Sequence, residues 1–247
     1  MRSPDRPRDR CRLGEQSREQ SREQSREQSR EQLRRCSRVT LCHPTRRVWF
    51  MSSTPSALGT LADMRFGVVD VETSGLSTHR DRVLQVAIVT VDGQGTVLDT
   101  WVSLIRPRNR VLFRLGPRHI HGLTRSALRS APPAAAVLSE LAQRLQGTTF
   151  TAHNAPFDAT FLQQSAHRAH VELPVSPALC TLRLSRRLDP ERMLSHRLTD
   201  ICHRYGVPLE RPHDALEDAL ATAAVLPHLL RAHGVVTPDQ MSLLTTS

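Results

Sequence analysis

The stretch Phe66-Gly67-Val68-Val69-Asp70-Val71-Glu72-Thr73-Ser74-Gly75-Leu76 decides the fold. Its first residues are mostly apolar and β-favouring, and they predict a strand over about 66–71 that Ser74 and Gly75 interrupt. Asp70 and Glu72 project from the same face because side chains alternate along a strand. Two adjacent carboxylates at the end of a buried strand repel each other and lose hydration. A hard cation such as Mg²⁺ or Mn²⁺ would remove both costs. The alternative is a strand end whose acids face water.

The remaining pattern predicts an α/β fold with a mixed sheet. Two β-rich runs, 82–91 and 95–104, are joined by Asp92-Gly93-Gln94 and predict an antiparallel hairpin. Short strands are expected at 148–152 and 178–182, and helices at about 134–146, 156–169, 198–205 and 214–231. The order βββαβα followed by helices implies that the first three strands are antiparallel and that helices flank the sheet.

Charge is spread unevenly along the 247 residues. Residues 1–50 hold 14 Arg and 7 acids (net +7), and residues 51–247 hold 20 Arg and 17 acids (net +3), which together give the net +10 of the chain. Nucleic-acid binding therefore cannot be argued from bulk charge. The cysteines form no C-x-x-C pair, so neither a disulfide framework nor a zinc finger is indicated. No apolar run reaches the length of a membrane span, and a cytoplasmic protein is expected.

The chain divides into three parts by composition. Residues 1–63 form an arginine-rich leader in which EQSR repeats four times from residue 15 and EQLR follows, a pattern without an apolar face that predicts disorder. Met51 and Met64 both stand close before the first strand, and either of them, rather than Met1, could be the true start of translation. In that case part of the leader would not be translated. A folded domain is expected at 64–233 and a flexible tail at 234–247.

Two further motifs supply candidate ligands. Pro156 suits the first turn of a helix with Asn154 or a neighbour as its cap, and Asp158 then lies over the apolar face beside the sheet. His213 lies just before the last helix and Asp218 one turn into it, so both can face one point. Taken singly, each has an ordinary explanation, since the helix dipole favours an acid in the first turn and a His there is often a capping residue.

The combination D-x-E, N-x-P-F-D and H-x(4)-D resembles the DEDDh 3′–5′ exonuclease family, which includes the epsilon proofreading subunit of bacterial DNA polymerase III. The resemblance covers residues 66–231 and extends to Thr73-Ser74-Gly75-Leu76, Ile120-His121-Gly122-Leu123-Thr124 and Cys180-Thr181-Leu182. It implies a ribonuclease-H-like fold.

The resemblance also implies the chemistry. Asp70, Glu72, Asp158 and Asp218 would hold two Mg²⁺ or Mn²⁺ ions, and His213 would be the general base. The product would be 5′-nucleoside monophosphates released from a 3′ end. Substrate contacts would come from Thr73 and Leu76, with Leu76 beside the terminal base, and from His121, Asn154 and Phe157. For Phe157 the alternative is a core aromatic, and for His121 and Asn154 it is a role in stabilising loops.

Three alternatives remain at this level. The H-N-x-P-F-D form at 153–158 favours the polymerase-associated branch and hence DNA, whereas the oligoribonuclease branch would act on RNA. The second alternative is a catalytically dead relative that binds nucleic acid or a partner. The third is a binding module whose function depends on the arginine-rich leader.

The C-terminal residues suggest a partner. Gln240-Met241-Ser242-Leu243-Leu244 resembles the short peptide by which bacterial replication proteins dock on the sliding clamp, with Gln240, Leu243 and Leu244 as contacts. The alternative is a segment packed on its own domain. The polymerase partner and the oligomeric state are not predicted.

Overall fold

The computed structural model describes residues 60–109 and 113–245, all of which belong to a compact unit spanning Pro55–Ser247. The predicted leader therefore lies outside the described residues up to residue 59, and so do two of the candidate start sites, Met1 and Met51.

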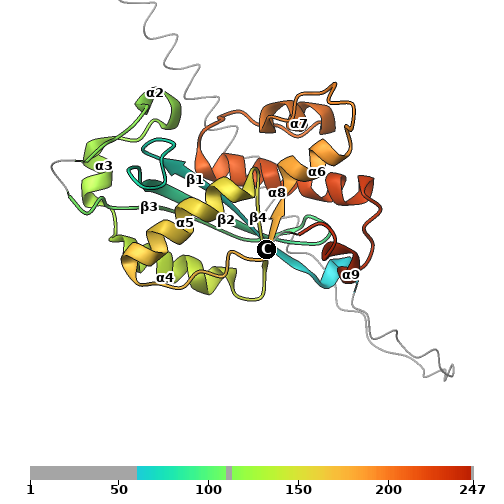
Figure 1. Ribbon diagram of the computed structural model, residues 1–247, viewed down its shortest axis with the longest axis horizontal. Coiled ribbons are helices and arrows are strands. Elements are labelled where there is room, and N and C mark those ends of the chain that lie inside the picture. The colour runs from blue at the N-terminus through green and yellow to red at the C-terminus, as the bar shows by residue number, and fades with distance from the viewer. Residues whose placement is uncertain (1–59, 110–112, 246–247) are drawn as a thin grey trace, which may run out of the picture. The chain divides into compact units, whose positions relative to one another are not determined.

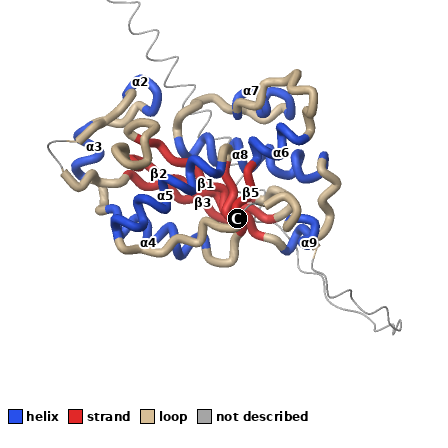
Figure 2. The backbone as a smooth tube through the Cα atoms, viewed as in Figure 1, coloured by secondary structure: helices blue, strands red, loops and turns tan. Residues whose placement is uncertain are grey.

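The centre of this unit is a five-stranded mixed sheet in the order β3-β2-β1-β4-β5 (Figures 1 and 2). Strands β1 (Arg65–Thr73), β2 (Val83–Asp92) and β3 (Val97–Leu104) pair antiparallel. Strands β4 (Thr149–Ala152) and β5 (Ala178–Cys180) continue the sheet in parallel with β1. The predicted fold class is confirmed, including the antiparallel arrangement of the first three strands.

Helices cover both faces of the sheet. The helices of the described residues are η1 (Leu61–Asp63), α2 (Arg118–His121), α3 (Arg125–Ser130), α4 (Ala134–Leu145), α5 (Ala155–Ala169), α6 (Thr181–Arg187), α7 (Leu198–Tyr205), α8 (Ala215–Ala232) and α9 (Pro238–Met241). One apolar cluster joins the sheet to α8 and includes Phe66 and Val68. A second cluster joins the other face to α4 and α5 and includes Val69 and Val71. Strand β1 is thus buried on both faces, which explains its nearly continuous apolar run.

The tight connection between β2 and β3 depends on glycine. A Cβ atom on Gly93 would lie 1.8 Å from the backbone oxygen of Leu61 in η1. Asp92 completes the turn, since its Oδ1 accepts hydrogen bonds from the N–H groups of Gln94 and Thr96. The Asp-Gly turn expected from the sequence therefore also seats the segment that precedes β1.

Two expectations differ from the structure. The strand expected at 178–182 ends at Cys180, because helix α6 begins at Thr181 and buries Leu184 in the cluster around α8. Residues 234–245, expected within a flexible tail, include helix α9, and its Met241 is 3% exposed. The side-chain oxygen of Gln240 accepts hydrogen bonds from the N–H groups of Val236 and Thr237 at 2.7 and 3.1 Å. Met241 and Leu244 pack on the domain because burial removes their apolar surface from water, whereas Val236 and Leu243 are exposed.

None of the described helices is long and apolar enough to cross a membrane.

Candidate active site

Four carboxylates gather near the end of β1. Phe66 and Val68 face α8, so the strand alternation places Asp70 and Glu72 on that same face. Helix α8 presents Asp218 from its first turn, and α5 contributes Asp158. The side chain of Asp158 reaches the strand, where the backbone of Val71 favours its ionised form and lowers its pKa against the effect of burial.

The carboxylates are withdrawn from water, and no arginine of the described residues forms an ion pair with them. Glu72, Asp158 and Asp218 are 8%, 3% and 9% exposed. Burial, followed by the negative charges of Asp158, Asp218 and Glu72, raises the pKa of Asp70 well above its usual range. Burial also raises the pKa of Glu72 to about 8, with Asp218 and Asp214 adding to the effect. The pKa values of Asp158 and Asp218 are raised mainly by burial too.

His213 completes the cluster from the loop before α8. Its backbone takes a left-handed conformation (φ 69°), and its N–H group donates to Asp218 Oδ2 at 3.0 Å. Asp214 caps α8 by accepting from the N–H groups of Leu216 and Glu217. Glu72, His213 and Asp218 can each offer one ligand atom, and these three atoms lie within 4.8 Å of one another. Ligand atoms this close together could hold a metal ion, and the His213 side chain is exposed at the rim of the cluster.

A cation would satisfy an atom that the protein leaves without a partner. Asp218 Oδ1 is buried and makes no hydrogen bond within the described part of the chain. Buried polar atoms are nearly always paired, and a buried carboxylate oxygen is costly when left alone. Hard oxygen donors crowded in this way suit Mg²⁺ or Mn²⁺. The residues present therefore fit a divalent metal.

The loop after Glu72 holds two of the expected substrate contacts. The hydroxyl group of Thr73 donates to the Gly75 carbonyl at 2.8 Å, and Leu76 is 85% exposed. Asp81, which is buried, holds this loop by accepting from the Ser77 N–H at 3.0 Å and the Ser74 hydroxyl at 3.2 Å. The sequence analysis missed Asp81, since it stands in a polar stretch with no motif.

The other expected contacts have different surroundings. Both ring nitrogens of His121 are used inside the domain, since Nε2 donates to the Leu115 carbonyl and Nδ1 accepts from the Leu123 N–H, each at 3.0 Å. Asn154 is exposed at the N-cap of α5, with a left-handed backbone and no side-chain cap bond. Phe157 is half-buried and packs on Phe161 with ring centroids 4.8 Å apart.

His153, in the same motif, is a neutral group. Burial lowers its pKa to about 4, and its Nδ1 lies 3.0 Å from Thr181 Oγ1. This contact links the segment before α5 to the start of α6. No signal in the sequence pairs these two residues, because 28 positions separate them.

Residues 68–226 match the model of the Exonuclease family of the RNase T type, and the chain belongs to this family. A PolC-type DNA polymerase III of Bacillus cereus is 33% identical over 171 residues, covering 69% of this chain and 12% of that protein. A putative bifunctional exonuclease/endonuclease protein of Mycobacterium tuberculosis is 32% identical, covering 78% of this chain and 30% of the other. The 3′-5′ exonuclease DinG of Bacillus subtilis is 30% identical, covering 67% of this chain and 18% of that protein.

Solved structures support the fold. Escherichia coli exonuclease I in complex with a dT13 oligonucleotide matches with a TM-score of 0.62 at 21% identity, covering 73% of this chain and 43% of that one. The chain thus spans less than half of each of these proteins. The resemblance to the DEDDh 3′–5′ exonuclease family is confirmed, and so is the ribonuclease-H-like arrangement of the sheet.

Proposed function

We propose that this chain is a metal-dependent 3′–5′ exonuclease that releases 5′-nucleoside monophosphates from DNA 3′ ends. Its role would be in proofreading or repair, and it would resemble the epsilon subunit of DNA polymerase III. The observation that carries the proposal is the convergence of Asp70, Glu72, Asp158 and Asp218, with His213 at the rim of the cluster. DNA is favoured because several relatives are DNA polymerases of the PolC type, and exonuclease I, which shares the fold, was solved with an oligodeoxynucleotide.

The four carboxylates would hold two divalent ions, Mg²⁺ or Mn²⁺. When bound, such ions lower the pKa of a coordinated water and neutralise charge on the phosphoryl group and the leaving 3′ oxygen. The chain's contribution is a dry, rigid set of oxygen donors. Asp70 and Glu72 are fixed by β1, while Asp158 and Asp218 start from the first turns of two helices that pack on opposite faces of the sheet.

His213 would take the proton from the attacking water. Imidazole is suited to this step because it accepts and releases protons near neutral pH. The exposed ring can pass the proton to solvent, and the hydrogen bond from its backbone to Asp218 keeps it beside the carboxylates.

The terminal nucleotide would lie against the loop after β1. Leu76 exposes an apolar side chain that suits contact with the face of a base, and Thr73 stands next to Glu72 in the chain. For His121 we propose a supporting role, because both of its nitrogens serve the backbone of its own loop. Asn154 and Phe157 remain proposed contacts at the start of α5.

The test is hydrolysis of 3′-labelled and 5′-labelled single-stranded DNA and RNA with Mg²⁺. We expect stepwise shortening of DNA from the 3′ end, lost in EDTA and in Asp70→Asn, while the matched change Asp99→Asn on strand β3 retains activity. Preferred cleavage of RNA would move the assignment to the exoribonuclease branch. Binding without metal-dependent cleavage of either polymer would indicate a catalytically dead relative.

A further inference from the structure

A long segment between β3 and α4 is basic and free of acids. From Thr100 to Ser139 the sequence has seven arginines and no Asp or Glu; the arginines are Arg106, Arg108, Arg110, Arg114, Arg118, Arg125 and Arg129. The described part of this segment, residues 105–109 and 113–130, is here called the basic lobe, and it contains α2 and α3.

Most of the positive charge of the basic lobe faces solvent. Five of its arginines are exposed, at positions 108, 114, 118, 125 and 129. Among the described residues, only Arg114 of this group comes within ion-pair distance of a carboxylate, with its Nε 3.9 Å from Asp81 Oδ1. Arg125 lies over the ring of Phe113, 4.6 Å from its centroid, which presents the guanidinium group on an aromatic support. The lobe is therefore a concentrated source of positive potential.

The basic lobe adjoins the candidate active site through backbone contacts. A Cβ atom on Gly116, whose φ is +75°, would lie 2.5 Å from the carbonyl oxygen of Ser74, so this part of the lobe packs directly on the loop after Glu72. His121 ties α2 to the same segment through the Leu115 carbonyl. The segment that carries the arginines thus packs beside the loop that follows Glu72.

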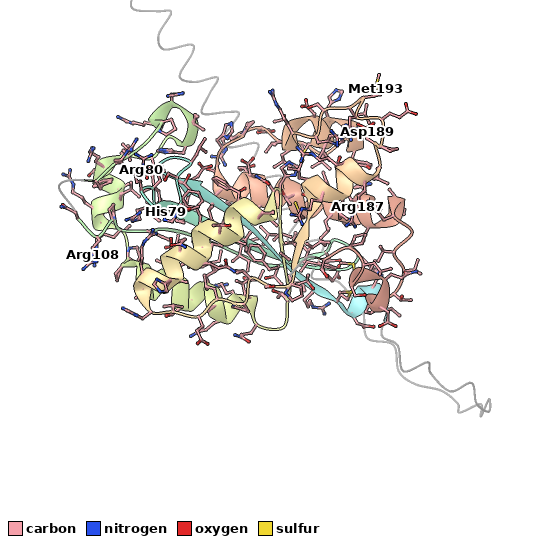
Figure 3. All side chains as sticks on the ribbon, in the orientation of Figure 1. His79, Arg80, Arg108, Arg187, Asp189 and Met193 are labelled. Carbon is pink, nitrogen blue, oxygen red and sulfur yellow. The ribbon has the colours of Figure 1, made fainter. Side chains whose placement is uncertain are left out.

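The opposite side of the site lacks this bias. Residues 181–217, which include α6 and α7, hold seven arginines and six acids, so their net charge is +1 against +7 for 100–139. Figure 1 places α2 and α3 at one end of the sheet and α6 and α7 at the other. In Figure 3, His79, Arg80 and Arg108 lie on the side of α2 and α3, whereas Arg187, Asp189 and Met193 lie on the side of α6 and α7. Net positive charge is therefore concentrated on the side of α2 and α3.

We propose that the basic lobe binds the phosphodiester backbone of the substrate strand upstream of its 3′ end, and so makes affinity depend on strand length. This inference rests on the proposed exonuclease function and extends it beyond the terminal nucleotide. Guanidinium groups pair well with phosphate oxygens, and each phosphate contact releases counterions, so binding weakens as salt rises.

The test compares two triple variants with equal loss of charge. The lobe variant is Arg108→Gln/Arg118→Gln/Arg125→Gln. The control is Arg183→Gln/Arg192→Gln/Arg231→Gln, three exposed arginines outside the lobe that make no ion pair within the described residues. The substrates are a 20-nucleotide and a 3-nucleotide single-stranded DNA, and KM and kcat are measured at 50 and 200 mM KCl. Thermal unfolding verifies that both variants are folded.

Three phosphate contacts to a single strand correspond to a slope of about 2 for log KM against log salt concentration, at about 0.7 per contact. The KM of the wild type for the 20-mer should therefore rise roughly 20-fold more between the two salt concentrations than that of the lobe variant. The 3-mer should show no such difference, and the control should follow the wild type. If the lobe variant fails to fold, the single change Arg118→Gln should lower the slope by about 0.7.

Equal effects of the two triple variants would overturn the proposal, because bulk charge would then explain the result. Equal effects of the lobe variant on the long and the short substrate would also overturn it. If the wild type hydrolyses neither substrate, the exonuclease proposal fails separately. Fluorescence anisotropy of labelled forms of the two oligonucleotides then measures their binding to the wild type and to both triple variants. The lobe is tested by how steeply that binding weakens with salt.

Discussion

Stability in the absence of metal should fall as pH rises, and Glu72→Gln should remove much of that fall. The pKa of Glu72 is about 8 in the folded chain, against an ordinary value of 4.5, because burial and the charges of Asp218 and Asp214 disfavour its ionised form. The folded state therefore holds this proton more tightly than the unfolded state does. Unfolding free energy is unaffected below pH 4.5 and declines as pH rises from there to 8.

The size of the effect follows from the two pKa values. Their difference, 8 − 4.5, is about 3.5, and each pKa unit corresponds to about 1.4 kcal/mol. Glu72 alone should therefore cost the metal-free protein about 5 kcal/mol by pH 8. Its side chain is 8% exposed, so solvent screens little of this cost.

Urea denaturation in EDTA at pH 5, 6.5 and 8 measures the effect. Glu72→Gln should match the wild type near pH 5 and exceed it by several kcal/mol at pH 8. The matched control Glu191→Gln, an exposed acid between α6 and α7, should follow the wild-type curve. Addition of Mg²⁺ should raise wild-type stability at pH 8 but raise that of Glu72→Gln less. Parallel pH profiles for the wild type and Glu72→Gln in EDTA would refute the reasoning.

Three structural substitutions test the packing of the domain. Leu138→Ala in α4 removes a fully buried side chain and should cost about 2–5 kcal/mol of unfolding free energy in urea denaturation; a cost near zero would contradict the core assignment. Gly93→Ala forces a Cβ atom against the Leu61 carbonyl and should cost about 1–3 kcal/mol, lowering the melting temperature. Gln240→Ala removes the acceptor of two backbone N–H groups at α9 and should cost about 1 kcal/mol locally, seen as faster hydrogen exchange of Val236 and Thr237. Unchanged exchange at those amides would show that the cap is dispensable.

The proposed clamp contact gains no support from the structure. Gln240 is engaged in the cap of α9 and Leu244 packs against the cluster around α8, whereas Leu243 is 77% exposed. A peptide that docks by inserting Gln240 and Leu244 would first have to release these two side chains from the domain, at the cost of the contacts that they make. The sequence pattern could not reveal this, because five residues do not specify whether an apolar pair faces its own core or a partner.

The sequence by itself determined the strand β1, the shared face of Asp70 and Glu72 and the antiparallel hairpin of β2 and β3. These features follow from local rules, since alternation along a strand and the Asp-Gly turn involve only neighbouring residues. Only the tertiary structure decided which side chains meet across long separations, such as His153 with Thr181 and Asp81 with Arg114. It also decided that the acid-free arginine segment packs beside the loop after Glu72, where Gly116 lies against Ser74. Such contacts depend on how the helices pack on the sheet, and no local pattern of residues encodes that packing.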